Sequence, residues 1–210
     1  MSVYVARHGE TEWNRAGRMQ GRLGAPLTER GHAQARALAR FAARVGVRHV
    51  IASPLARALD TARYTVEALA CPLSPCDALM ELDFGDCTGF TEADIAERYP
   101  TLRREREADK WRHRWPGGES YADASARVAR AFEQGALPGE PGTLIVAHQA
   151  LNRVLSRYLA GAAESAVLAM AQPSTVVLRF EGREVSHARI PEADAEPIAW
   201  EPGLFGSGKR

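Results

Sequence analysis

The sequence has few cysteines, no long hydrophobic run and almost no net charge. Cys71, Cys76 and Cys87 are an odd number without paired CxxC spacing, which favours reduced thiols over a disulfide framework or a zinc site. No stretch approaches the ~20 apolar residues of a membrane span, and the N-terminus leads into a predicted strand instead of a signal peptide. The net charge of +1 gives no bulk attraction to nucleic acid or membrane. We therefore expect a cytoplasmic protein with neither as a partner.

The 210 residues, 45% hydrophobic and 25% charged, are ordinary for one well-cored globular domain. Strand and helix patterns alternate, which predicts an α/β fold with three layers, α/β/α: a mostly parallel sheet with helices on both faces. The predicted domain covers residues 1–191 and includes a lid-like insert at about 92–115. Residues 192–210 are rich in Pro, Gly and acids, and we expect a loosely ordered C-terminal tail there.

The first predicted strand ends in a cation, an imidazole and a glycine. Val3 to Ala6 is a short apolar run, followed by Arg7 and His8. In open α/β sheets the ligand crevice lies outside the carboxyl ends of the strands, so these side chains are placed to meet a substrate. Because the guanidinium of Arg7 matches phosphate or carboxylate bidentately, the pattern indicates an anion held against the His8 imidazole.

Two later segments supply matching partners. Ser53-Pro54 forms a turn after a predicted strand at 47–52, and Arg57 follows in the first turn of the next helix, where the helix N-terminus also favours an anion. The predicted strand at 143–147 ends in His148, as the first strand ends in His8. Neighbouring parallel strands bring both imidazoles into one crevice.

Four segments carry a resemblance to a known family. They are Arg7-His8-Gly9-Glu10-Thr11 with Trp13-Asn14, the SPLxRAxxTA pattern from Ser53, the ExxFGxxxG pattern from Glu81, and Gly118-Glu119-Ser120. Together they resemble the histidine phosphatase superfamily, which includes the cofactor-dependent phosphoglycerate mutases. Among Glu81, Asp83 and Asp86, which the residues alone leave as equal candidates, the family motif selects Glu81. For Glu119 two roles stay open: orienting His148 or the lid, or helping to cap a helix.

The resemblance assigns a role to each residue. His8 would take the phosphoryl group, Glu81 would move the proton, and Arg7, Arg57 and His148 would neutralise the transferring charge. Asn14, Gln20 and Gly21 would contact the phosphate, in a loop where the family often has an acid at the position of Gly24. Gln149 would bind substrate: Gln149-Ala150 and Arg153 resemble the bisphosphatase domain that removes the 2-phosphate of fructose 2,6-bisphosphate. No metal site and no cofactor is expected.

The expected function is a metal-independent phosphomonoesterase that acts through a phosphohistidine on a small phosphorylated metabolite. A phosphoglycerate mutase is the first alternative, but the insert at 92–115 lacks the additional length that mutases carry there. A non-catalytic module that binds a phosphorylated ligand is the second. The basic segment at 98–114 is either a lid or a solvated helical surface laced with salt bridges, and the sequence has no signal for the oligomeric state.

Overall fold

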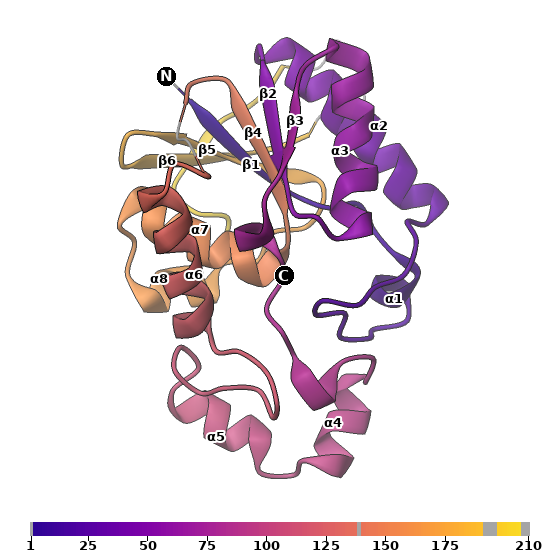
Figure 1. The fold of residues 1–210 in the computed structure, drawn as a ribbon, viewed down its shortest axis with the longest axis vertical. Helices are drawn as coiled ribbons and strands as arrows, with labels where there is room; N and C mark the ends of the chain where they lie inside the picture. The colour runs from indigo at the N-terminus through magenta and orange to yellow at the C-terminus, as the bar shows by residue number, and fades with distance from the viewer. Residues whose placement is uncertain (1, 138–139, 191–196, 207–210) are drawn as a thin grey trace.

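The computed structural model describes residues 2–137, 140–190 and 197–206, and these form one mixed α/β sandwich (Figure 1). The strands are β1 (Val3–Arg7), β2 (His49–Ala52), β3 (Leu73–Pro75), β4 (Thr143–Ala147), β5 (Val176–Glu181), β6 (Glu184–Arg189) and β7 (Glu201–Pro202). The α-helices are α1 (Glu12–Arg15), α2 (Glu29–Arg44), α3 (Ala56–Leu69), α4 (Glu92–Arg98), α5 (Leu102–Ala108), α6 (Tyr121–Glu133), α7 (Gln149–Ala160) and α8 (Glu164–Ala169). Two short 3₁₀ helices are η1 (Asp77–Leu79) and η2 (Gly85–Cys87).

The sheet has the strand order β3-β2-β4-β1-β5-β6-β7. The first four strands are parallel, and β5 to β7 extend the sheet in antiparallel fashion. The predicted α/β fold with a parallel core is therefore confirmed, with an antiparallel extension built from the last strands. In this order β1 and β4 lie side by side, and Arg7 pairs in register with Ala147.

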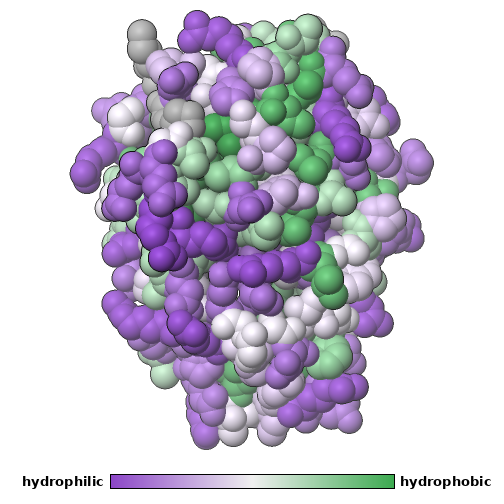
Figure 2. Space-filling model, in the orientation of Figure 1, coloured by the Kyte–Doolittle hydropathy of each residue, from purple (hydrophilic) through white to green (hydrophobic). Residues whose placement is uncertain are grey.

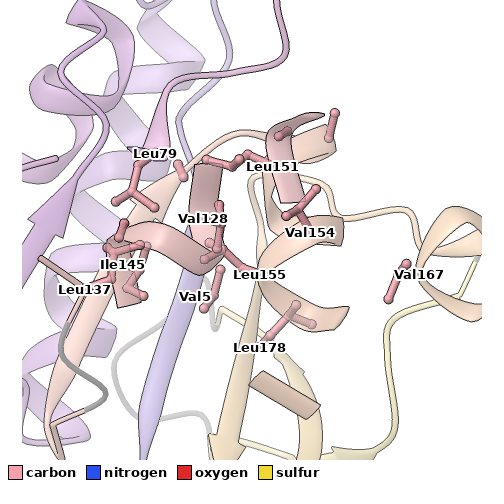
Figure 3. Packing of buried hydrophobic residues seen from close by; sticks show 14 of the residues in the cluster. Val5, Leu79, Val128, Leu137, Ile145, Leu151, Val154, Leu155, Val167 and Leu178 are labelled. Atoms are coloured by element: carbon pink, nitrogen blue, oxygen red, sulfur yellow. The ribbon is translucent and has the colours of Figure 1, made fainter. Parts of the chain in front are cut away.

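Alternate residues of the central strands supply two separate hydrophobic cores. Val5 of β1 belongs to the core under α6 and α7, whereas Tyr4 and Ala6 belong to the core under α2 and α3. This is the period-2 alternation of a strand that is covered on both faces. Figure 3 shows the first core, in which Val128 of α6 and Leu151 of α7 pack toward the sheet. Helices on both faces leave the carboxyl ends of the parallel strands as the place for a cleft.

Side-chain caps start two of the long helices where the sequence indicates. The Thr28 hydroxyl accepts a hydrogen bond from the backbone N–H of Gly31 at 3.0 Å, at the start of α2. Ser120 and Asp123 form a reciprocal capping box at the start of α6. Ser120 and Asp123 thus form the cap that an S-x-x-D pattern typically makes at a helix start, and such caps contribute ~1 kcal/mol each.

Helices α4 and α5 lie apart from the sheet, at the bottom of Figure 1, and together form much of the insert. Their surface alternates between exposed ion pairs and inward-facing residues: Arg103 pairs with Glu107 at 3.0 Å, whereas the Arg106 guanidinium lies 3.7 Å over the Trp115 ring. Figure 2 shows hydrophilic side chains over much of this face of the molecule, together with a hydrophobic area in its upper part. Across the described ranges, no helix combines the length and the hydropathy that a membrane crossing requires.

The described part of the C-terminal segment, residues 197–206, packs against the sheet. β7 pairs with β6, and the Trp200 ring lies 6.1 Å from Tyr4 and 6.0 Å from Phe41 between centroids. This differs from the expectation of a loosely ordered tail at 192–210, because the aromatic side chains in this polar stretch find partners on the sheet and α2. Residues 192–196 and 207–210 of that expected tail lie outside the described residues.

Candidate functional site

The carboxyl ends of β1 and β4 bring His8 and His148 together. The two strands are parallel neighbours. The ring centroids of His8 and His148 lie 5.2 Å apart, at an interplanar angle of 57°. The backbone N–H of His8 continues the ladder by donating to the carbonyl of Ala147 at 3.0 Å. The two imidazoles therefore lie close together, because adjacent parallel strands end at the same edge, but only His8 is among the described residues that line the cavity.

The hydrogen bonds of His8 define its tautomer. Its Nδ1 lies 2.7 Å from the carbonyl oxygen of Gly9, which only accepts, so Nδ1 carries the hydrogen. The Nε–H of Arg57 donates to Nε2 at 3.2 Å, so Nε2 presents a lone pair. Burial, with Arg7 and Arg57 adding to it, holds the pKa of His8 well below the usual value of 6.5. His8 is therefore a neutral imidazole at neutral pH, with an Nε2 lone pair that accepts from Arg57.

Arg57 stands in the first turn of α3 and joins the two histidines to the loop that carries Gln20, Gly21 and Leu23, here called the substrate loop. Its Nε–H is shared between His8 and Nδ1 of His148, each at 3.2 Å. Its Nη1 and Nη2 donate to the carbonyls of Leu23 at 2.6 Å and Gly21 at 2.7 Å. Burial lowers the pKa of Arg57 to about 10, so the guanidinium remains a cation at neutral pH.

His148 is fully buried behind Arg57 and has the opposite tautomer. Its Nδ1 accepts from Arg57, so its Nε2 carries the hydrogen and donates to the Ser53 hydroxyl at 2.8 Å. Burial, followed by the charge of Arg57, lowers the pKa of His148 well below its usual value. It is not among the described residues that line the cavity, so in this structure its contact with the site runs through Arg57 and His8.

Glu81 lies under the N-terminus of α7. Its Oε1 accepts from the backbone N–H groups of Leu82 at 3.0 Å and Leu151 at 3.1 Å. Its Oε2 accepts from the N–H of Ala150 at 3.3 Å and keeps a lone pair for a proton. The carboxyl group is thus fixed in place by three backbone donors and lines the same cavity as Arg7 and His8.

Arg7 lies in this cavity and is held by Gln149. Its Nη1 donates to Oε1 of Gln149 at 2.8 Å and to the Gln172 carbonyl at 3.4 Å. Its Nε is buried without a hydrogen-bond partner. Burial is the main cause that lowers the pKa of Arg7. A buried N–H group without a partner can donate to a bound anion without first breaking another hydrogen bond.

The residues predicted to contact phosphate line the same cavity. Oδ1 of Asn14 accepts from the backbone N–H and the hydroxyl of Thr11 in the capping box of α1, which leaves its amide NH₂ for a ligand. Oε1 of Gln20 is buried without a partner, and Gly21 turns with φ of +51° so that its carbonyl meets Arg57. At Gly24 a Cβ would lie 2.8 Å from Nη1 of Arg57, so here glycine lets the loop approach the guanidinium closely.

Glu119 does not orient His148 in this structure. Its carboxylate accepts from Arg22 at 2.7 Å, from Arg127 at 3.1 Å and from the backbone N–H of Asp83 at 3.2 Å. It joins the substrate loop to α6 and to the segment after Glu81. Neither of the two roles left open by the sequence describes this contact, which depends on groups far apart in the chain.

Sequence reasoning did not assign the polar residues on the side of the cavity that faces the insert. Arg153 donates from Nη1 to the Tyr121 hydroxyl at 2.7 Å and from Nε to the Met170 carbonyl at 2.9 Å. Nη1 of Arg106 is buried without a partner, and burial, with Arg153 and Arg106 adding to it, lowers the pKa of Lys110. Lys110 lies in the turn after α5 ends at Ala108, so no helical spacing in the basic segment could have paired it with Arg106.

The whole cavity has a volume of about 710 Å³. Of the nine predicted site residues, all except His148 line it: Arg7, His8, Asn14, Gln20, Gly21, Arg57, Glu81 and Gln149. Within the described residues no group of three or more His, Cys, Asp or Glu side chains is placed to hold a metal ion. The cavity is therefore lined by a neutral imidazole, a carboxyl group and several guanidinium groups.

Comparisons with known proteins agree with this geometry. The family model for the histidine phosphatase superfamily (branch 1) matches residues 3–190. The 6-phosphofructo-2-kinase/fructose-2,6-bisphosphatase of Gallus gallus is 38% identical over 159 residues, which are 75% of this chain and 32% of that protein. The human form 4 of that enzyme is 34% identical over 181 residues, which are 85% of this chain and 37% of that protein. The chain thus spans about a third of the length of these curated relatives.

Solved structures match over nearly the full chain. A mycobacterial glucosyl-3-phosphoglycerate phosphatase, in complex with VO3, has a TM-score of 0.73 and 26% identity and covers 99% of each chain. A putative alpha-ribazole-5'-P phosphatase from Escherichia coli has a TM-score of 0.74 and 25% identity, covering 99% of this chain and 96% of that one.

Proposed function

The chain belongs to the histidine phosphatase superfamily (branch 1), and we propose that it is a metal-independent phosphomonoesterase that works through a phosphohistidine at His8. The observation that carries the proposal is the state of His8. Its Nε2 lone pair accepts from the Nε–H of Arg57, its Nδ1 donates to the Gly9 carbonyl, and both His8 and Arg57 line the cavity. A nucleophile for phosphoryl transfer needs such a lone pair together with nearby positive charge for the phosphoryl oxygens.

In the first step, Nε2 of His8 forms a bond to phosphorus while the bond from phosphorus to the ester oxygen breaks. The leaving oxygen takes the proton of the Glu81 carboxyl group and departs as an alcohol. Arg7 and Arg57 hold the phosphoryl oxygens, and the unpartnered Nε of Arg7 gains an acceptor. The imidazole, now bonded to phosphorus at Nε2, still donates from Nδ1 to Gly9.

In the second step, water attacks the phosphohistidine. Glu81, now a carboxylate, takes a proton from the water as the new P–O bond forms and the N–P bond breaks. Inorganic phosphate leaves, His8 returns to its neutral tautomer and Glu81 to its acid form. One carboxyl group serves both steps, first as the acid and then as the base.

We propose that the substrate carries a second anionic group beside the transferred phosphate. Arg106, Lys110 and Arg153 are three of the cations that line the insert side of the cavity, where Tyr121 adds a hydroxyl and Arg103 is paired with Glu107. An unpartnered buried nitrogen on Arg106 supports a ligand at this place. The curated relatives are named for fructose 2,6-bisphosphate, which has two phosphates, so this compound is the first to test.

The first experiment measures hydrolysis of fructose 2,6-bisphosphate and of an aryl phosphate by the wild type and His8→Ala, with a chelator present. We expect turnover and an acid-labile, alkali-stable phosphoenzyme in the wild type, and neither in the variant. Loss of activity with the chelator would contradict metal independence. A reaction that needs a bisphosphate primer and returns the phosphoryl group to the product would favour a mutase. Tight binding without turnover would favour a binding module.

A second experiment tests the second anion. Arg106→Gln should raise KM for the bisphosphate by about 10-fold or more, as expected for a lost charge-assisted hydrogen bond, and should raise KM for the aryl phosphate by less. Arg112→Gln is the matched control, because Arg112 is exposed on the neighbouring turn, pairs with Asp109 and is not among the described residues of the cavity. Equal effects of Arg106→Gln on both substrates would contradict the assignment.

A further inference from the structure

The chain that leaves β1 carries the proposed nucleophile through two peptide units without regular secondary structure. The carbonyl of Gly9 in the second unit accepts from Nδ1 of His8 at 2.7 Å. The other end of that unit, the N–H of Glu10, donates to Oε1 of Gln34 on α2 at 2.8 Å. Gly31 packs so closely that a Cβ on Gly9 would lie 2.5 Å from its carbonyl oxygen. The orientation of the His8 ring therefore depends on how this short stretch of backbone is held.

Two side-chain hydroxyls hold the first unit, which joins His8 to Gly9. The hydroxyl of Ser174, just before β5, donates to the His8 carbonyl at 2.6 Å. The N–H of Gly9 donates to the Thr61 hydroxyl on α3 at 2.9 Å, and that hydroxyl donates onward to the Arg57 carbonyl at 2.7 Å. The two hydroxyls thus come from segments far apart in the chain and meet opposite ends of one peptide bond.

We infer that Thr61 and Ser174 are positioning residues that orient His8 by clamping the peptide bond between His8 and Gly9. With the clamp in place, the Gly9 carbonyl faces Nδ1 and fixes the hydrogen there, so Nε2 keeps its lone pair toward Arg57. When the clamp is loosened, the plane of the next peptide rotates and the Gly9 carbonyl turns away. Only the Nε–H of Arg57, which is shared with His148, then opposes the tautomer with the hydrogen on Nε2. That tautomer has no lone pair at the atom that would attack phosphorus.

Helix packing alone does not explain the Thr61 hydroxyl. Thr65, one turn later on the same helix, is also buried, and its hydroxyl has no hydrogen-bond partner. A buried threonine is therefore tolerated on this side of α3 without a polar contact, whereas Thr61 makes two. Neither Thr61 nor Ser174 is among the described residues that line the cavity, so their effect must pass through His8.

The test compares Thr61→Val and Ser174→Ala with Thr61→Ser, which restores the hydroxyl, and with Thr65→Val as the matched control. The inference rests on the proposed phosphohistidine mechanism for its kinetic arm: phosphoenzyme formation is followed in single turnovers with an aryl phosphate, and KM in steady state. The second arm is independent of turnover. It records the ¹⁵N resonances of His8, assigned by their absence in His8→Ala, because these report which ring nitrogen carries the hydrogen.

Thr61→Val should slow phosphoenzyme formation by about 10- to 100-fold, the scale of a small misplacement of a reacting group, with KM within about threefold of the wild type. Its His8 resonances should change from the Nδ1–H form to a mixture of tautomers. Ser174→Ala should act in the same direction, Thr61→Ser should recover most of the rate, and Thr65→Val should match the wild type.

A wild-type rate and tautomer in either Thr61→Val or Ser174→Ala would overturn the inference. A slow Thr61→Val that Thr61→Ser does not rescue would assign the effect to shape and not to the hydroxyl. If Thr61→Val does not fold, Ser174→Ala, at a partly buried position, decides the question. A wild type that neither turns over nor forms a phosphoenzyme would contradict the proposed function, while the tautomer measurement would still test the clamp.

Discussion

Acid should destabilise the fold through the two buried histidines, His8 and His148. Both have pKa values held well below 6.5 by burial and by neighbouring arginines, so the folded protein keeps them neutral while the unfolded chain protonates them. Stability is thus fully present above pH 6.5 and is lost as the pH falls below that value. At pH 5 each histidine that stays neutral in the folded protein lowers the free energy of unfolding by about 2 kcal/mol, so the pair lowers it by about 4 kcal/mol.

The assay is urea unfolding between pH 7.5 and 5.0, with the unfolding free energy extrapolated to water. His8→Ala should reduce the loss of stability over this range by about 2 kcal/mol, whatever its stability at pH 7.5. His49→Asn, which removes a histidine outside the cleft, is the matched control. If His8→Ala loses as much stability as the wild type, His8 is not a neutral imidazole in the fold, and the argument for its lone pair fails.

Three other predictions test the cleft and the C-terminal segment. Glu81→Gln should lower kcat about 10²- to 10⁴-fold for an alkyl phosphate and much less for an aryl phosphate, whose leaving group needs no proton; equal losses would argue against proton transfer by Glu81. Inorganic phosphate at 100 times its Kd should stabilise the wild type by about 2.7 kcal/mol, and thermal unfolding of Arg57→Gln should show little of this shift. Trp200→Ala should destabilise the fold by about 1–2 kcal/mol in urea, because its ring contacts Tyr4 and Phe41; no change would mean that residues 197–206 add nothing to stability.

The strand-end residues were predictable because local patterns and one rule of sheet geometry suffice for them. Val3 to Ala6 reads as a buried strand, so Arg7 and His8 fall at its end, and the same holds for His148 after β4. Arg57 was predictable because Pro54 and the helix pattern place it in the first turn of α3. The positions of these residues follow from the residues next to them in the sequence and do not depend on distant contacts.

Other features depend on contacts that the local sequence does not encode. Glu81 differs from Asp83 because its carboxyl group accepts hydrogen bonds from the N–H groups of Ala150 and Leu151, about 70 residues away in the sequence. Arg103 and Arg106 on the same short helix both line the cavity, but the Arg103 side chain is largely exposed and pairs with Glu107, whereas Arg106 packs over the Trp115 ring. The local sequence does not distinguish these two environments. Composition alone indicated a loose tail, because the aromatic contacts that hold it join residues at opposite ends of the chain.

Arg57 joins the two histidines through a single N–H group. Its Nε–H lies 3.2 Å from both Nε2 of His8 and Nδ1 of His148, so one hydrogen serves two acceptors. In the proposed mechanism Nε2 of His8 uses its lone pair to bond phosphorus and is then no longer an acceptor. His148 Nδ1 must therefore keep its own lone pair so that Arg57 stays in place, which requires the hydrogen on Nε2, where Ser53 accepts it at 2.8 Å. The opposite tautomers follow from one requirement: His8 is left free to react while His148 holds the cation that receives the phosphoryl group.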